Sequence, residues 1–234
     1  MSAEHRTVFK VGVGGPVGSG KTALIEALVP MAIARGFSPV VVTNDIYTQL
    51  DAEHVRAALN GILSADRVVG VETGSCPHTA VRDDPTANIA AMDELLDKFP
   101  DADLLFLESG GDNLTLTFSP TLVDAYIFVI DVAEGDDIPR KKGPGITHSD
   151  LLVINKVDLA PYVRVDLDVM RMGAESARPD GAPYIMTNSL TGSGLDEVIE
   201  FIATTSQTGR SDEVRQLLDA LPPHDHSHSH DHAH

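Results

Sequence analysis

Gly15-Pro-Val-Gly-Ser-Gly-Lys-Thr22 decides the fold, because it fits the pattern G-x-x-x-x-G-K-[ST] without a mismatch. The apolar segment from Val8 to Val13 precedes it and can form a strand, and apolar residues at helical spacing follow it. Strand, glycine-rich loop and helix in this order are the context of a phosphate-binding loop. We therefore predict that nucleotide binds to Gly15, Pro16, Val17, Gly18, Ser19, Gly20, Lys21 and Thr22.

The residue types in this loop suit a triphosphate, whose concentrated negative charge needs many small donors. Gly15, Gly18 and Gly20 allow positive φ and a close approach of backbone N–H groups. The N-terminus of the following helix adds a partial positive charge. We expect Lys21 to act catalytically by reaching the β- and γ-phosphates, and the Thr22 hydroxyl to bind Mg²⁺.

Composition restricts the class of protein. The chain has 234 residues, of which 42% are apolar, so it can bury a sizeable core. A formal net charge of −18 argues against nucleic-acid binding, which needs a basic face. One cysteine excludes an internal disulfide, and the sequence lacks a signal-like segment or a long apolar run. We expect a cytoplasmic protein that binds no membrane.

Short apolar runs recur along the chain with helical segments between them. Several are apolar at consecutive positions, as in parallel strands that helices cover on both faces. One helix is predicted after Asp84-Pro85, with apolar residues from Ile89 to Phe99 at helical spacing. The pattern predicts an α/β P-loop NTPase fold with a mostly parallel sheet and strands at 39–42, 104–107, 126–130, 151–154 and 183–186.

Carboxylates follow two of the predicted strands, at the edge where nucleotides bind in such sheets. Asp45 follows the run that ends at Val42. It either binds Mg²⁺ or orients the attacking water, or it is an ordinary turn or helix-capping aspartate. Glu108 follows Leu107, where most phosphate-loop proteins carry aspartate. The longer glutamate could act through a water or with a second carboxylate. We predict catalytic roles for both residues.

Asn155-Lys156-Val-Asp158 follows another apolar run and fits the guanine-recognition pattern N-K-x-D. Its aspartate can accept two hydrogen bonds from guanine, a donor pair that adenine lacks. The motif therefore favours GTP over ATP, with a solvated Lys/Asp turn as the minor alternative. Asn188 lies in a Ser/Gly-rich segment after the last run, where a further base-contacting loop is expected.

Cys76-Pro-His78 combines a thiol and an imidazole two positions apart. Two ligands cannot complete a site for a first-row metal, so in a monomer an ordinary turn is the simpler interpretation. Across a two-fold axis the pair supplies four ligands, which suit Ni²⁺ in a square plane or Zn²⁺ in a tetrahedron. Glu72 lies four residues before Cys76 and could sense Mg²⁺ or the γ-phosphate.

The C-terminus divides the chain into a predicted P-loop GTPase domain, 1–221, and a disordered tail, 222–234. The tail alternates histidine with small or acidic residues and cannot build a core. An expression tag is the alternative to a natural metal-binding tail, although Asp, Ser and Ala interrupt the histidines. The tail residues expected to bind Ni²⁺ or Zn²⁺ are His224, His226, His228, His230, His232 and His234.

One long segment, 133–148, is predicted to be irregular and carries the basic run Arg140-Lys141-Lys142 in an acidic chain. Long loops are often functional. Docking to a partner or to nucleotide is one hypothesis, and a solvated charge run is the other.

Taken together, these motifs resemble the UreG family of urease accessory GTPases over nearly the whole chain. The resemblance implies a GTP- and Ni²⁺-dependent homodimer that delivers nickel to the urease apoprotein with the accessory proteins UreE, UreF and UreH/UreD. It also implies that Cys76 and His78 bind nickel and that Asp45 and Glu72 belong to a Mg²⁺ and nucleotide switch. The motifs that carry it are 15–22, 43–48, 71–78, 108–113, 131–136 and 155–158.

Our leading hypothesis is a nickel metallochaperone that hydrolyses GTP, slowly until its partners dock. A hydrogenase-maturation GTPase of the HypB type is disfavoured, because its cysteine-rich N-terminal motif is missing. An ATP-dependent small-molecule kinase is opposed by Asn155-Lys156-Val-Asp158. A nickel-storage or sensing protein with a structural nucleotide remains a third alternative.

Overall fold

The computed structural model describes residues 8–45, 50–73, 79–111 and 114–208. Its sheet has seven strands in the order β3-β2-β4-β1-β5-β6-β7, and all neighbouring strands run parallel. This confirms the predicted fold class, since a parallel order of this kind needs a crossover between each pair of strands. The strands are Phe9–Gly14, Pro39–Asp45, Val68–Glu72, Leu104–Glu108, Ala125–Asp131, Leu151–Asn155 and Tyr184–Met186, numbered β1 to β7.

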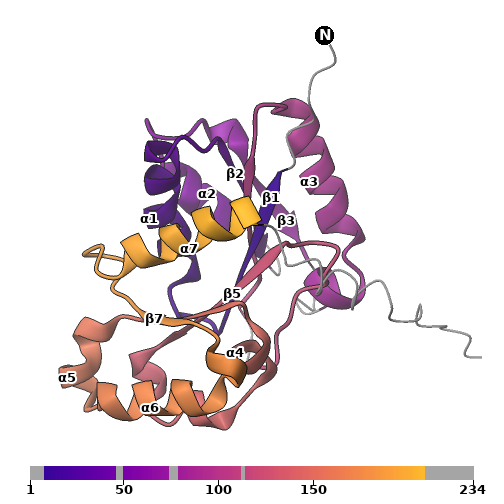
Figure 1. The fold of residues 1–234 in the computed structure, drawn as a ribbon. Helices are drawn as coiled ribbons and strands as arrows, with labels where there is room; N and C mark the ends of the chain where they lie inside the picture. The colour runs from indigo at the N-terminus through magenta and orange to yellow at the C-terminus, as the bar shows by residue number, and fades with distance from the viewer. Residues whose placement is uncertain (1–7, 46–49, 74–78, 112–113, 209–234) are drawn as a thin grey trace, which may run out of the picture.

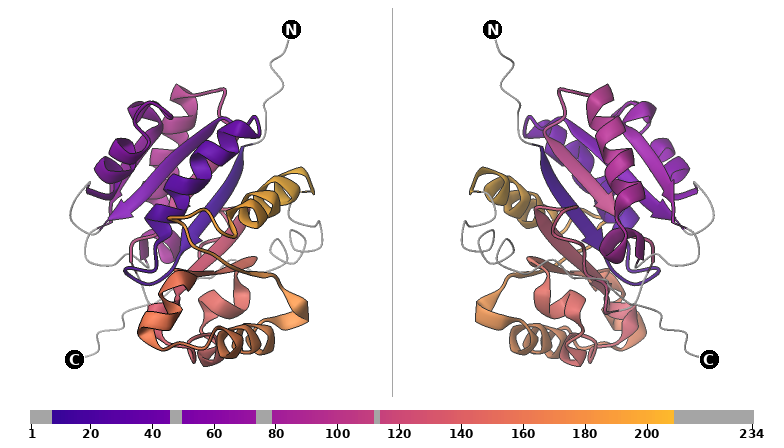
Figure 2. Two further views of the ribbon diagram at one scale, coloured as in Figure 1. Left: turned by 90° about the vertical axis from the view of Figure 1, so that its left-hand side faces the viewer. Right: turned by 90° about the vertical axis from the view of Figure 1, so that its right-hand side faces the viewer.

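Helices cover both faces of the sheet (Figure 1). One face packs against α1 (Lys21–Ala34), α2 (Leu50–Ala58) and α7 (Leu195–Thr208). The other packs against α3 (Thr86–Lys98), α4 (Pro144–His148) and α6 (Leu167–Ala177), while α5 (Ala160–Val163) is short. In the two side views of Figure 2, α7 is the yellow helix, and it packs beside α1. Short 3₁₀ or π turns lie at 65–67, 79–83, 132–134, 139–141, 157–159 and 179–181.

Each side of the sheet carries its own apolar core. Strands that lie between the two cores are buried along their whole length. Examples are β4 (Leu104–Glu108) and β5 (Ala125–Asp131). Strands buried on both faces read as continuous apolar runs, which explains why the sequence predicted them well. Within the described ranges, no helix is both long and apolar enough to cross a membrane.

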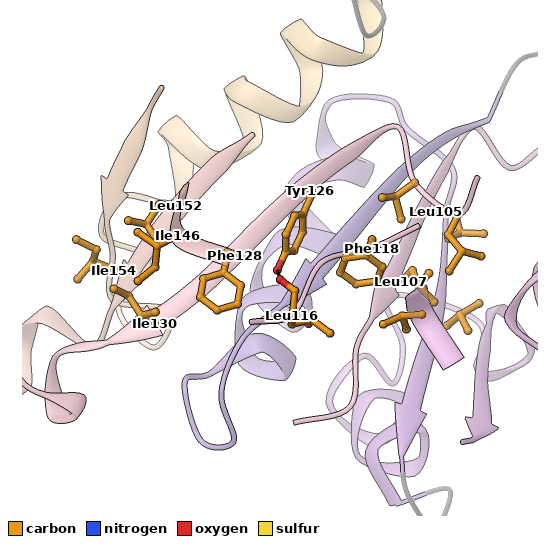
Figure 3. Close-up of a cluster of buried hydrophobic side chains, with 14 of the residues drawn as sticks. Leu105, Leu107, Leu116, Phe118, Tyr126, Phe128, Ile130, Ile146, Leu152 and Ile154 are labelled. Atoms are coloured by element: carbon orange, nitrogen blue, oxygen red, sulfur yellow. Dashed lines mark hydrogen bonds between the residues drawn. The ribbon is translucent and has the colours of Figure 1, made fainter. Parts of the chain in front are cut away.

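The connection from β4 to β5 crosses β1, and its described residues, 109–111 and 114–124, contain no helix. Phe118 and Val123 from this connection pack on Gly12, where a Cβ atom would meet both side chains at 3.0 Å. Figure 3 shows Phe118 beside Tyr126, and their rings meet edge to face with centroids 5.1 Å apart. Glycine at position 12 therefore makes room for an aromatic cover over the central strand.

Two details differ from the sequence predictions. A strand at Val68–Glu72 forms the sheet edge, although its short apolar run was not predicted as a strand. In α3, Ile89 is 37% exposed, whereas Asn88 is fully buried among core residues. A polar side chain therefore takes an interior place that the helical spacing assigned to an apolar one, and it needs hydrogen-bond partners there.

The 133–148 segment, predicted to be irregular, contains two 3₁₀ turns and α4. Its basic residues Arg140, Lys141 and Lys142 are exposed, and Lys141 lies 3.6 Å from Asp137. Exposure of these side chains fits docking to a partner or to nucleotide as well as a solvated charge run. Both hypotheses therefore stay predictions.

Candidate nucleotide-binding site

The phosphate loop joins β1 to α1, as predicted. Gly18 and Gly20 have φ of 81° and 95°, values that favour glycine. Gly20 precedes the first turn of α1, and no side chain caps this helix. The N–H groups of the first turn therefore have no side-chain acceptor and point toward the place where a phosphate would lie.

Lys21 folds back over the loop that precedes it. Its Nζ donates hydrogen bonds to the carbonyl oxygens of Gly15 and Pro16, each at 3.0 Å, and the residue is 6% exposed. The ammonium group is thus held at the loop where the sequence analysis expects phosphates to bind. Phosphate oxygens would compete with these two carbonyls for its protons.

Thr22 and Glu108 join α1 to the end of β4. The Thr22 hydroxyl donates to Glu108 Oε1 at 2.6 Å, and Oε2 is buried without a hydrogen-bond partner. Burial raises the pKa of Glu108 to about 7, against the lowering effects of Thr22 and Lys21. The threonine hydroxyl and the free carboxylate oxygen are hard oxygen groups, which suit Mg²⁺ and the water molecules that it keeps.

The other predicted switch carboxylates lie at the same edge of the sheet. Thr43 pairs in register with Glu108, and Asp45 pairs with Glu72 two positions further on. Glu72 is exposed and lines an open groove of about 550 Å³ together with Thr79 and Asp84. The sheet therefore brings the ends of β2, β3 and β4 together beside the phosphate loop.

Several predicted metal ligands lie outside the described residues. These are Cys76, His78 and the six histidines from His224 to His234, and the side chain of Asp45 is likewise not described. Among the residues that are described, no group of three or more potential ligands (His, Cys, Asp or Glu) is arranged to hold a metal ion. The nickel assignment therefore stays a prediction.

The guanine motif lines a second part of the site. A cavity of about 190 Å³ is bounded by Gly20 and Ala23 of the phosphate-loop side and by the N-K-x-D and Asn188 loops. Asn155 ties these parts together, because its Nδ2 donates to Ser19 O at 3.1 Å while its Oδ1 accepts from Thr187 and Ser189. The structure thus brings all the predicted base- and phosphate-contacting segments to one place.

Asp158 and Asn188 occupy different positions in this cavity. Asp158 lies in an exposed turn at the cavity wall, where its carboxylate is accessible to a base. Asn188 is 5% exposed, and its Oδ1 accepts from the backbone N–H groups of Leu190 and Thr191 at 2.9 and 3.2 Å. Asn188 therefore shapes its loop, and this contact does not use its amide N–H groups.

Asp131 and Glu134 lie beside the candidate site, and the sequence analysis gave neither of them a role, although both belong to the 131–136 motif. Lys156 Nζ donates to Asp131 Oδ2 at 2.8 Å and also to the carbonyl of Gly18. Glu134 accepts from the backbone N–H of Asp131, and burial raises the pKa of Glu134 to about 7. The available signal was the position of Asp131 directly after an apolar run, which it shares with Glu108 and Asn155.

A parallel sheet with a phosphate loop after its central strand, and a base cavity beside that loop, defines a P-loop nucleotide-binding protein. Residues 9–183 match the family described as "CobW/HypB/UreG, nucleotide-binding domain". The chain is 64% identical over 195 residues to urease accessory protein UreG 2 of Streptomyces griseus, covering 83% of this chain and 86% of that one. It is 56% identical over 199 residues to UreG of Yersinia enterocolitica, with 85% and 90% covered.

The fold is also similar to solved structures of HypB. The Archaeoglobus fulgidus hydrogenase maturation factor has 30% identity and a TM-score of 0.67, covering 87% of this chain and 92% of that one. The Helicobacter pylori protein, solved in complex with nickel, has 22% identity and a TM-score of 0.70, with 86% and 88% covered, and supports the fold. The chain belongs to the UreG family of urease accessory proteins. Fold and family together support the assignment to the class of nucleotide-hydrolysing GTPases.

The buried Glu108 carboxyl predicts a pH-dependent stability of the free protein. Its folded-state pKa of about 7 exceeds the ordinary value of 4.5, so the folded chain binds this proton more tightly than the unfolded chain. Stability should therefore fall as pH rises between these two values. In buffer without Mg²⁺ or nucleotide, wild type should lose about 2–3 kcal/mol more than Glu108→Gln from about pH 5 to about pH 8.

Urea denaturation at a series of pH values measures this difference. Comparison with Glu108→Gln isolates Glu108 from Glu134, whose pKa is also raised to about 7. Parallel pH profiles for wild type and variant would contradict the assignment of this titration to Glu108.

Proposed function

We propose that this protein is a GTP-hydrolysing nickel metallochaperone that couples GTP binding and hydrolysis to nickel delivery into the urease apoprotein. The single observation that carries the proposal is the joint nucleotide site, in which Asn155 links the guanine loop to the phosphate loop. Membership in the UreG family supplies the urease context. The nickel complex of the structurally similar Helicobacter pylori HypB is consistent with nickel as the cargo.

On this proposal, the nucleotide lies along the carboxyl ends of β1, β6 and β7. Residues 15–22 surround the phosphates, while Asp158 accepts hydrogen bonds from the guanine edge. Lys156 lies against the base and is held by Asp131 and the carbonyl of Gly18. Buried Asn188 keeps the last loop in shape through its contacts with Leu190 and Thr191.

Magnesium would be held by Thr22 with Asp45 and Glu72, and it would neutralise developing charge on the phosphates. Lys21 would leave the carbonyls of Gly15 and Pro16 and bind phosphate oxygens. Glu108, whose pKa is near neutrality, would accept a hydrogen bond from a water close to the γ-phosphate. We propose slow hydrolysis by the isolated protein and faster hydrolysis once partners dock.

Nickel would be bound by Cys76 and His78 of two chains in a homodimer that forms with GTP. This segment follows Glu72, which pairs with Asp45 at the nucleotide edge, so the two sites adjoin in the chain. We propose that 1–221 is the GTPase domain and that 222–234 is a tail whose histidines bind Ni²⁺, for which Zn²⁺ competes. Expected partners are urease and UreE, UreF and UreH/UreD in the cytoplasm.

Guanine recognition is tested by Asp158→Asn. Guanine presents two donors to a carboxylate, whereas xanthine presents one donor and one carbonyl, which suit an amide. The variant should bind GTP about 100-fold more weakly and should bind xanthosine triphosphate better than wild type does. Titration of fluorescent nucleotide analogues measures both affinities.

The matched control is Asp196→Asn, an exposed carboxylate on α7 that lies outside the cavity, and it should behave as wild type. Unchanged GTP affinity in Asp158→Asn would overturn guanine recognition by this residue.

Nickel delivery is tested by the stoichiometry of metal in protein lacking 224–234. With Mg²⁺ and a non-hydrolysable GTP analogue, this tailless chain should bind one Ni²⁺ per two chains, because the site needs the Cys76 and His78 ligands of both. Cys76→Ala should abolish this binding, and GDP should weaken it. Equilibrium dialysis with analytical ultracentrifugation measures metal and mass together.

The same experiment separates delivery from storage. Loss of all specific nickel binding on deletion of the tail would favour a storage or sensing protein with a structural nucleotide. Retention of the Cys76-dependent site would support delivery.

A further inference from the structure

Two asparagine side chains are paired in the core beneath the nucleotide edge. Asn44 of β2 and Asn88 of α3 are both fully buried. Asn44 Nδ2 donates to Asn88 Oδ1 at 3.0 Å, and Asn88 Nδ2 donates to Asn44 Oδ1 at 2.9 Å. This reciprocal amide pair fixes the first turn of α3 to the end of β2.

The pair extends at both ends to backbone carbonyls. Asn44 Nδ2 also donates to the carbonyl of Glu108 at 2.9 Å, and Asn88 Nδ2 also donates to the carbonyl of Ala80 at 2.9 Å. Both protons of each amide nitrogen are therefore used. The result is a continuous buried chain of hydrogen bonds from Glu108 through Asn44 and Asn88 to Ala80.

One end of this chain lies at the nucleotide site. The side chain of Glu108 faces α1, where it accepts from Thr22, while its carbonyl accepts from Asn44. Asn44 also directly precedes Asp45, the residue that pairs in register with Glu72. A shift of Glu108 toward or away from a bound metal ion would therefore move an acceptor of Asn44.

The other end lies at the π turn Thr79–Asp83, which directly follows Cys76-Pro-His78 in sequence. Apart from Asn88, this turn is tied by Ser119 N–H to the carbonyl of Val81 at 2.8 Å and by Asp84 N–H to the carbonyl of Thr79 at 2.8 Å. Figure 1 shows α3 running beside β2, which contains Asn44, and beside β3, which precedes Cys76-Pro-His78 in the chain. Asn88 is thus placed between the nucleotide edge and the turn.

Burial makes this geometry demanding. An amide in the core that loses a partner bears the full cost of desolvation, so a displacement at one end favours a matching displacement at the other. Apolar side chains would fill the same space, and the helical spacing itself assigned the buried place to Ile89. The polar pair therefore supplies a directional connection that apolar packing would not give.

We propose that Asn44 and Asn88 are positioning residues that transmit the nucleotide state from Glu108 to the turn at 79–83. The transmission step involves Glu108, the amide pair and the turn at 79–83. Its consequence for nickel rests on the proposed function. Nucleotide bound at the phosphate loop shifts the position of Glu108. The amide pair passes this shift to the carbonyl of Ala80, and the turn at 79–83 changes its conformation. By reciprocity, a ligand that holds the turn changes nucleotide affinity by the same factor.

Hydrogen–deuterium exchange of the full chain tests the transmission. In wild type, exchange in a peptide covering 79–83 should differ about fivefold or more between GDP and a Mg²⁺-bound non-hydrolysable GTP analogue. In Asn88→Leu this difference should disappear. Affinity for each nucleotide should stay within about threefold, because the side chain of Asn88 hydrogen-bonds to Asn44 and Ala80, which are not predicted nucleotide ligands.

The matched control is Leu95→Ala, which removes a buried side chain from the same helix and leaves both amides of the pair in place. It should melt at lower temperature yet keep the nucleotide-dependent difference in exchange. Asn88→Ser, a smaller polar replacement, gives the same test if the leucine variant does not fold. A nucleotide-dependent difference that survives in a folded Asn88 variant, or that is missing in wild type, overturns the proposal.

Nickel affinity, measured on the same proteins, distinguishes the two levels. If exchange at 79–83 depends on nucleotide and on Asn88 but nickel affinity ignores the nucleotide, then transmission stands and nickel coupling fails. If both depend on nucleotide in wild type and neither does in Asn88→Leu, both are supported.

Discussion

The hydrogen bond from Thr22 to Glu108 is the contact on which the site depends. It joins the first turn of the phosphate-loop helix to the end of the adjacent strand β4, and it leaves one buried carboxylate oxygen unpaired. A buried carboxyl of this kind is costly when ionised and unpartnered, and burial raises its pKa to about 7. On our proposal, a cation that binds with nucleotide would offset this cost.

The parallel sheet places other site residues at the same edge as the Thr22–Glu108 contact. Because all seven strands are parallel, their carboxyl ends meet at one edge, and residues from distant parts of the sequence gather there. Asn155 links the base loops to the phosphate loop, and Lys156 links Asp131 to Gly18. On our proposal, Asn44 and Asn88 extend the same system from Glu108 to α3 and the turn at 79–83, on the opposite face of the sheet from α1.

The sequence predicted the features that local patterns encode. The phosphate loop, the guanine motif and most strand positions follow from glycine spacing and from apolar runs. Contacts between segments that are distant in the chain could not be predicted from the sequence. The burial of Asn88 in place of Ile89 depends on partners on β2 and at Ala80. The glycine at position 12 depends on Phe118, which lies in the connection from β4 to β5. The ion pair of Asp131 was not predicted, because its partner Lys156 is distant in sequence.

The most direct measurement is the proton release that accompanies binding of Mg²⁺ and a non-hydrolysable GTP analogue. Calorimetry in buffers of different ionisation enthalpy gives this number. If the metal ion and its waters engage Glu108, wild type at about pH 7 should release roughly half a proton more than Glu108→Gln, because a carboxyl with its pKa at that pH is half protonated when free. Equal proton release by wild type and variant would contradict the account.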